Sequence, residues 1–111
     1  MEKIIERNLL FDFYGDLLTK RQRDIYQDAV YGDLSLSELA DDYGISRQGI
    51  HDQIKKCDKA LEEYESKLHL ISRFEKIKKY SNELRKEAEK SEDEELKKSI
   101  NELLTKINEQ L

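Results

Sequence analysis

The stretch from Leu36 to Lys55 reads LSELADDYGISRQGIHDQIK, and its spacing is that of two helices joined by a tight turn. Ala40 is small where the second helix would cross the first closely, and Gly44 comes four residues later, where such a turn calls for a positive φ. Ile45 and Ile50 then fill the angle between the helices. This pattern predicts a helix-turn-helix.

Helical patterns also precede this motif. Apolar residues recur at intervals of four over residues 3–18, which predicts an amphipathic helix. Thr19 and Gln22 have the spacing of a capping box, so a second helix is expected to begin there. Gly32 stands where a left-handed end of that helix is expected.

The remaining helix starts of the N-terminal half follow from similar signals. Ser35 and Glu38 repeat the capping-box spacing, and Ser46 suits the N-cap of a helix that begins at Arg47. The tyrosines beside the apolar faces are expected to pack in the core. Residues 1–66 are therefore predicted to form a headpiece of four helices with a helix-turn-helix and no wing.

From residue 50 onward the apolar residues alternate at intervals of four and three, as in the seam of a coiled coil. The expected seam, for packing or for a dimer, consists of Ile54, Cys57, Leu61, Tyr64, Leu68 and Ile71. The spacing slips after Ile71, which predicts a kink or break near Ser72.

The C-terminal segment, residues 67–111, has neither Gly nor Pro. Ser91 begins another capping box, after which a final helix is expected to fold back as a hairpin. Such an arm has one narrow apolar stripe, so it needs a partner. The partner is either the headpiece or the same stripe of a second chain, which would make a homodimer.

Candidate functional residues lie at the start of the second motif helix, because that part of a helix-turn-helix enters the major groove. The candidate nucleic-acid contacts are Ser46, Arg47, Gln48, His51 and Lys55, with Lys20, Arg21 and Arg23 as contacts to the DNA backbone. Arg47 suits guanine or a phosphate, and Gln48 suits adenine. Ser46 and the helix N-terminus suit a phosphate.

The charge of the headpiece opposes this interpretation. Residues 1–66 hold 9 basic and 15 acidic residues, and Asp41, Asp42 and Asp52 lie in or beside the motif. An acidic body lacks the basic footprint that supplies most non-specific DNA affinity. Two functions therefore stay open: a DNA-binding regulator, and a helical adaptor that binds a protein such as a GTPase or RNA polymerase.

Four runs of the sequence carry a family resemblance: TKRQR at 19–23, LSELA at 36–40, GISRQGIH at 44–51 and KALEEYE at 59–65. Together they resemble the promoter-reading fourth region of bacterial sigma factors. Over essentially the whole chain, including LFDFYGDLLT at 10–19, the sequence is still more similar to the YlxM family. This resemblance implies a DNA-binding or regulatory protein of the signal recognition particle pathway, encoded beside that particle's GTPase, and helical dimers.

Composition excludes several other classes. The chain of 111 residues is 41% charged and 37% hydrophobic and lacks proline and tryptophan, which excludes a sandwich or barrel and indicates an all-α protein. Cys57 is the only cysteine, and neither histidine has ligand spacing, so we expect no disulfide, metal or cofactor. No catalytic motif is present, so an enzyme is not expected. With no signal-like or membrane-spanning segment, we expect a cytoplasmic protein.

Overall fold

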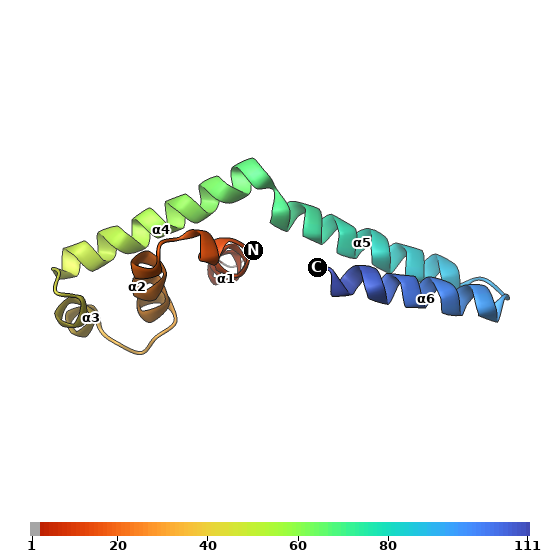
Figure 1. Cartoon of the computed structure of the whole chain (residues 1–111), viewed down its shortest axis with the longest axis horizontal. Coiled ribbons are helices and arrows are strands. Elements are labelled where there is room, and N and C mark those ends of the chain that lie inside the picture. The colour runs from red at the N-terminus through yellow and green to blue at the C-terminus, as the bar shows by residue number, and fades with distance from the viewer. Residues whose placement is uncertain (1–2) are drawn as a thin grey trace. The chain divides into compact units, whose positions relative to one another are not determined.

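The computed structural model describes residues 3–111, and every regular element in that range is helical (Figure 1). In order, the elements are α1 (Lys3–Tyr14), the 3-10 turn η1 (Gly15–Leu17), α2 (Lys20–Val30), α3 (Leu36–Tyr43), α4 (Arg47–Leu68), α5 (Leu70–Glu89) and α6 (Glu94–Glu109). The expected all-α class is confirmed. The chain forms two compact units: the N-terminal unit ends at His69, and the C-terminal unit begins at Leu70.

The first helix is shorter than the expected 3–18. α1 ends at Tyr14, and η1 leads into Leu18, whose backbone is extended with φ −73° and ψ 154°. A Cβ at Gly15 would lie 3.1 Å from the ring of Phe11, so a glycine lets the chain turn tightly against that ring. This turn delivers an extended Thr19 to the start of α2.

Both expected capping boxes in the N-terminal unit are present. The Thr19 hydroxyl accepts from the Gln22 N–H at 3.2 Å, and the Gln22 side chain accepts from the Thr19 N–H at 3.0 Å. Ser35 and Glu38 repeat this exchange at the start of α3. Each box satisfies two backbone donors that the first turn of a helix leaves without partners.

The expectation for Gly32 is wrong. Gly44 is the one glycine with a positive φ within residues 3–111, and α2 ends instead at Tyr31 in right-handed geometry. A Cβ at Gly32 would lie 2.5 Å from the Asp28 carbonyl oxygen. A glycine fits there because two backbone segments approach closely, whereas the sequence pattern suggested a change of handedness.

The predicted helix-turn-helix consists of α3, the turn at Gly44 and the start of α4 (Figure 1). Gly44 has φ 66° and ψ 32°, and the N–H groups of Gly44 and Ile45 both donate to the Ala40 carbonyl. The two helices pack with α2 around a buried core of Ile25, Leu39, Ala40 and Ile50. Burial of each large apolar side chain contributes about 1.5–3 kcal/mol, which fixes the direction of α4.

The sequence predicted that the tyrosines pack in the core. Three of them also donate hydrogen bonds from their hydroxyls to carboxylates. These bonds are Tyr14 to Glu65, Tyr26 to Asp58 and Tyr43 to Asp28. Asp58 of α4 also accepts from Arg7 of α1. The pKa of Tyr26 lies far above its usual value, mainly because the side chain is buried and also because its hydroxyl donates to Asp58. One carboxylate of α4 thus connects α1 and α2.

The seam residues lie in different surroundings. Cys57 and Leu61 are fully buried inside the N-terminal unit, and Ile54 packs against its core. The Tyr64 ring lies 6.0 Å from the Tyr14 ring, while Leu68 remains 44% exposed. α4 therefore uses the first part of its apolar stripe within its own chain, against α1, α2 and α3.

The predicted break lies three residues earlier than expected. His69 adopts left-handed geometry with φ 57° and ψ 29° and ends α4, and Leu70 starts α5, so the backbone is again helical at Ser72. Ile71 consequently belongs to the C-terminal unit. A positive φ is uncommon for a residue other than glycine, and no glycine at this position indicates the break in the sequence.

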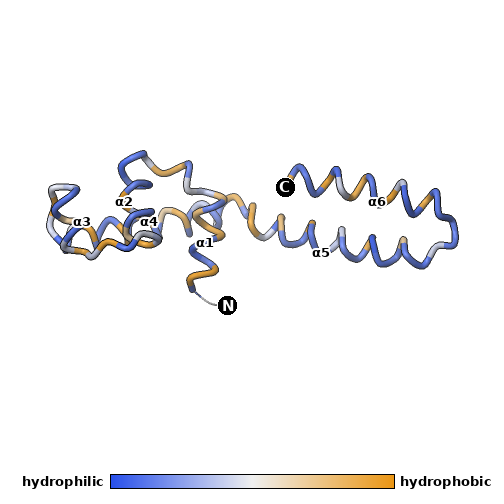
Figure 2. Tube along the Cα trace, turned by 90° about the horizontal axis from the view of Figure 1, so that it is seen from below, coloured by the Kyte–Doolittle hydropathy of each residue, from blue (hydrophilic) through white to orange (hydrophobic). Residues whose placement is uncertain are grey.

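The C-terminal unit is a hairpin in which α5 and α6 lie side by side, as Figures 1 and 2 both show. The N-cap of α6 is Asp93, whose carboxylate accepts from the N–H groups of Glu95 and Leu96. The expected cap, Ser91, instead accepts from the Asp93 N–H. Figure 2 shows hydrophobic positions recurring along both helices. Several large side chains of the hairpin are exposed: Ile77, Tyr80, Leu84, Leu96, Leu103 and Ile107.

Across residues 3–111, none of the helices has both the length and the apolar character that a bilayer crossing requires.

Candidate nucleic-acid interface

The start of α4 brings five predicted contact residues to one exposed region. One face of α4 packs against the core through Ile50, Ile54 and Cys57. The side chains at the start of the helix that lie away from this face are exposed: Ser46, Arg47, Gln48, His51 and Lys55. The Ser46 hydroxyl accepts from the Gly49 N–H at 2.9 Å, which confirms its N-cap role. The remaining N–H groups of the first turn carry partial positive charge, which favours an anion.

These exposed residues form two stripes along α4. Arg47, His51 and Lys55 are spaced four residues apart, so they share one flank of the helix. Gln48 and Asp52 share the next stripe, and the Gln48 amide donates to the Asp52 carboxylate at 2.9 Å. Within residues 3–111, neither Arg47 nor Lys55 takes part in an ion pair.

The basic residues predicted on α2 already have partners inside the chain. Lys20 lies 3.5 Å from Asp24, and Arg23 lies 2.9 Å from Asp16. Arg21 donates to the Tyr43 carbonyl at 3.3 Å and lies 5.8 Å from the centroid of the Tyr43 ring, so it satisfies a carbonyl at the end of α3. These contacts reduce the positive charge that α2 offers to a ligand.

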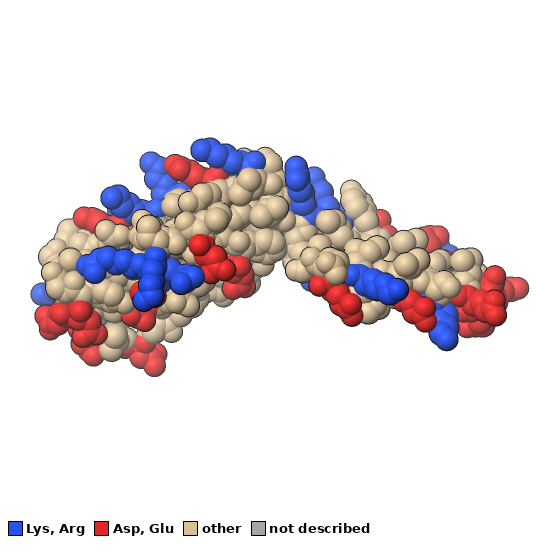
Figure 3. Space-filling model, viewed as in Figure 1, with Lys and Arg blue, Asp and Glu red and all other residues tan. Residues whose placement is uncertain are grey.

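Acidic residues surround this region. Figure 3 shows basic side chains over α2 and along α4, while acidic side chains gather over α3. Asp41 and Asp42 of α3 are exposed, and Asp52 lies between the basic residues of α4. Each carboxylate repels phosphate, so the site combines a small basic patch with an acidic border.

A cleft of about 420 Å³ lies beside the α4 stripe and includes two residues that the sequence analysis missed. Lys3 and Arg7 of α1 line it together with His51 and Lys55. Arg7 is paired with Asp58, which raises the pKa of Arg7, whereas Lys3 is exposed. The spacing of Lys3 and Arg7 put both on one face of α1, but only the fold brings that face to α4.

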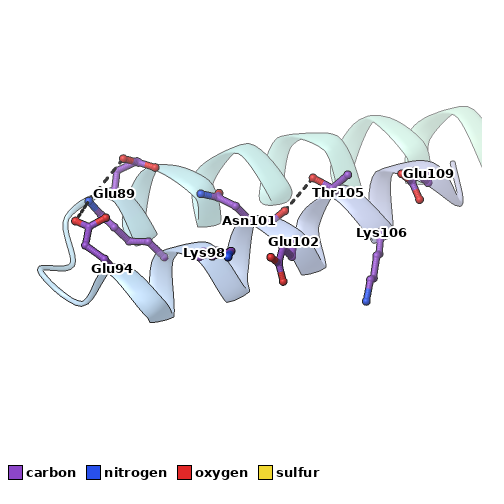
Figure 4. Close-up of a pocket in the computed structure, with 9 residues that line it drawn as sticks. Glu89, Glu94, Lys98, Asn101, Glu102, Thr105, Lys106 and Glu109 are labelled. Atoms are coloured by element: carbon purple, nitrogen blue, oxygen red, sulfur yellow. Dashed lines mark hydrogen bonds and ion pairs between the residues drawn. The ribbon is translucent and has the colours of Figure 1, made fainter.

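Three further features bear on other kinds of chemistry: the distribution of metal-ligating residues, the single cysteine and the cleft along α6. Within the described residues, no three His, Cys, Asp or Glu side chains gather as a metal site would require. Burial, and then the charge of Asp58, raise the pKa of the Cys57 thiol. A cleft of about 680 Å³ runs along α6, where Lys97 lies 3.4 Å from Glu94 and 4.0 Å from Glu89 (Figure 4). This cleft is lined by charged side chains of both signs.

Comparison with known proteins gives one family. Residues 1–109 match a family model described as "UPF0122: Putative helix-turn-helix protein, YlxM / p13 like". The description names a helix-turn-helix protein and no enzyme.

Several similar proteins cover most of the chain. The UPF0122 protein YlxM of Bacillus subtilis is 39% identical over 108 residues, which are 97% of this chain and 98% of that protein. A UPF0122 protein of Shouchella clausii is 45% identical over 86 residues, 78% of this chain and 79% of the relative. Another from Listeria welshimeri is 38% identical over 104 residues, 92% of this chain and 94% of the relative.

Proposed function

Because the chain belongs to the UPF0122 family of YlxM/p13-like proteins, whose description names a helix-turn-helix, we propose that its N-terminal unit binds duplex DNA. The observation that carries this proposal is the exposed start of α4, held in a fixed direction by Gly44 and the core around Ile50. In this arrangement the first turns of α4 enter the major groove.

Ser46 and the basic side chains have separate roles in this proposal. Arg47 contacts guanine or a phosphate, and Ser46 with the N–H groups beside it contacts a phosphate. His51 and Lys55 contact the DNA at the flank of α4. Lys20, Arg21 and Arg23 contribute less, because contacts to DNA would compete with their existing partners.

The biological setting that we propose is the signal recognition particle pathway. Its support is the sequence resemblance to the YlxM family, which implies a gene position beside the GTPase of that particle. The DNA upstream of this gene cluster is therefore the first target to test.

Fluorescence anisotropy with this upstream duplex tests the proposal. Wild-type protein should bind, and its affinity should fall steeply as salt rises from 50 to 200 mM. Replacement of Arg47 and Lys55 by alanine should weaken binding at least tenfold, whereas Lys67→Ala, three turns further along α4, should have little effect. Equally weak binding by all three proteins at low salt would refute DNA binding.

A second candidate is a helical adaptor that binds the targeting GTPase or RNA polymerase. It is favoured by the net charge of −6 in residues 1–66 and by the partners that already occupy the basic residues of α2. A pull-down after nuclease treatment separates the two functions. A retained protein partner supports the adaptor, and an empty result counts against it.

We also propose a homodimer with its contact on α6. Leu96, Leu103 and Ile107 expose large apolar surfaces at seven- and four-residue spacing, which places them on one face of α6, although α6 already packs against α5. Of the predicted seam, Cys57 and Leu61 are already covered within the N-terminal unit. A dimer would present two helix-turn-helix motifs to two half-sites of DNA.

A further inference from the structure

We infer that Gln48 and Asp52 act together as a specificity element that selects a cytosine in the bound DNA, with Asp52 accepting from the cytosine amine. This inference rests on the proposed DNA binding and deepens it. It assigns a positive role to an acidic residue whose charge otherwise only opposes binding.

The position of the pair follows from the helix. At 3.6 residues per turn, Gln48 and Asp52 lie on the side of α4 opposite Ile50, which is fully buried. Both are exposed and belong to the first two turns. In a groove entered by the start of α4, they project furthest toward the base edges, while His51 and Lys55 lie nearer the cleft beside α1.

The hydrogen bond between the two side chains orients them. Gln48 Nε2 donates to Asp52 Oδ1 at 2.9 Å, so one amide hydrogen is already used. The second amide hydrogen and the carbonyl oxygen of Gln48 stay available, which is the pair of groups that recognises adenine. The other carboxylate oxygen of Asp52 stays available as an acceptor.

The chemistry of Asp52 restricts the base that it tolerates. An ionised carboxylate only accepts hydrogen bonds. In the major groove, cytosine offers its N4 amine as a donor with no acceptor beside it, and adenine offers its N6 amine next to the N7 acceptor, whereas guanine offers only acceptors and thymine an acceptor and a methyl group. The N7 lone pair of adenine would repel the carboxylate, so cytosine suits Asp52 best. Opposite guanine or thymine, the second oxygen of the carboxylate would be desolvated without a partner. Asp52 therefore lowers affinity for most sequences and lowers it least where an amine is present, which produces selectivity.

In vitro selection from a random duplex library, with full-length protein at low salt, tests this inference. Wild-type protein should enrich sites with cytosine at one position, and the selected duplex should bind roughly tenfold more tightly than versions with guanine or thymine there. N4-methylcytosine at that position fills the major-groove side of the amine with a methyl group. It should cost wild-type protein a similar factor and leave Asp52→Asn unaffected.

Asp41→Asn is the matched control, because it removes the same charge from an exposed site on α3. It should raise affinity for all duplexes alike and keep the cytosine preference. Asp52→Asn should lose that preference, because the one carbonyl oxygen of asparagine accepts from Gln48 and its amide then presents a donor to the base. If Asp52→Asn keeps the preference and only binds every duplex more tightly, the inference is overturned and Asp52 merely repels phosphate. If folded wild-type protein enriches no duplex, the proposed function itself fails, and the inference fails with it. Circular dichroism checks the folding of each variant.

Discussion

The bond between Tyr26 and Asp58 gives a sharp test of how the N-terminal unit is held together. Tyr26 is fully buried, and Tyr26→Phe keeps the ring and removes only the hydroxyl that donates to Asp58. Hydrogen bonds to charged groups contribute about 1.5–3 kcal/mol. Asp58 keeps Arg7 as a partner, so no buried charge is left alone and we expect a loss of about 2 kcal/mol.

Near-UV circular dichroism of tyrosine measures this loss selectively. Of the six tyrosines, only Tyr80 lies in the C-terminal unit, so the signal follows the unfolding of the N-terminal unit in urea or on heating. For a unit of this size, 2 kcal/mol corresponds to a melting temperature lower by roughly 8–16 °C.

Tyr31→Phe, at the C-cap of the same helix, is the control, because Tyr31 is 43% exposed and its hydroxyl makes no hydrogen bond within residues 3–111. Its expected cost is below about 0.5 kcal/mol. A loss for Tyr26→Phe that is equally small, or a loss that Tyr31→Phe reproduces, would refute the importance of the bond.

Four further outcomes are expected. The bond to Asp28 raises the pKa of Tyr43 from 10.0 to about 12, so urea stability should fall as the pH rises from about 10 to 12, and less so in Tyr43→Phe. Buried Cys57 should react with a chromogenic disulfide reagent only as fast as the N-terminal unit unfolds. Gly44→Ala should cost about 1–2 kcal/mol in urea, because its φ of 66° strains an L-residue although the added Cβ meets no atom within 4 Å. Leu103→Asp, at a site 58% exposed, should halve the mass seen by light scattering without loss of helicity; an unchanged dimer mass would exclude this contact.

Local signals account for what the sequence predicted correctly about the fold. Thr19, Ser35 and Ser46 cap helices through partners three residues away, and Gly44 relieves strain at its own position. Such features need no knowledge of the rest of the chain. Errors occurred where two local signals overlapped, as at Asp93, and where no special residue marks the change, as at His69. A further error occurred at Gly32, where the glycine permits a close backbone approach instead of a left-handed helix end.

Long-range partners could not be predicted in this way. The Tyr14–Glu65 and Arg7–Asp58 bonds each join residues 51 positions apart, so nothing in the spacing indicates them. At the candidate site, the exposed residues of α4 followed from the motif, and the pair of Gln48 and Asp52 follows from their four-residue separation. The bond that engages Arg21 spans 22 positions and depends on the packing of α2 and α3.

The tyrosine bonds also divide the acidic residues of the N-terminal unit into two groups with different freedom to change. Asp28, Asp58 and Glu65 each accept a tyrosine hydroxyl, so neutral substitutes would weaken the fold. Exposed Asp41 and Asp42 make no such bond within residues 3–111 and can vary at little cost in stability. Mutation or protein engineering could therefore raise or lower the attraction of this unit for a polyanion by changing Asp41 and Asp42 alone. The carboxylates bonded to tyrosines set a minimum of negative charge that every folded variant retains.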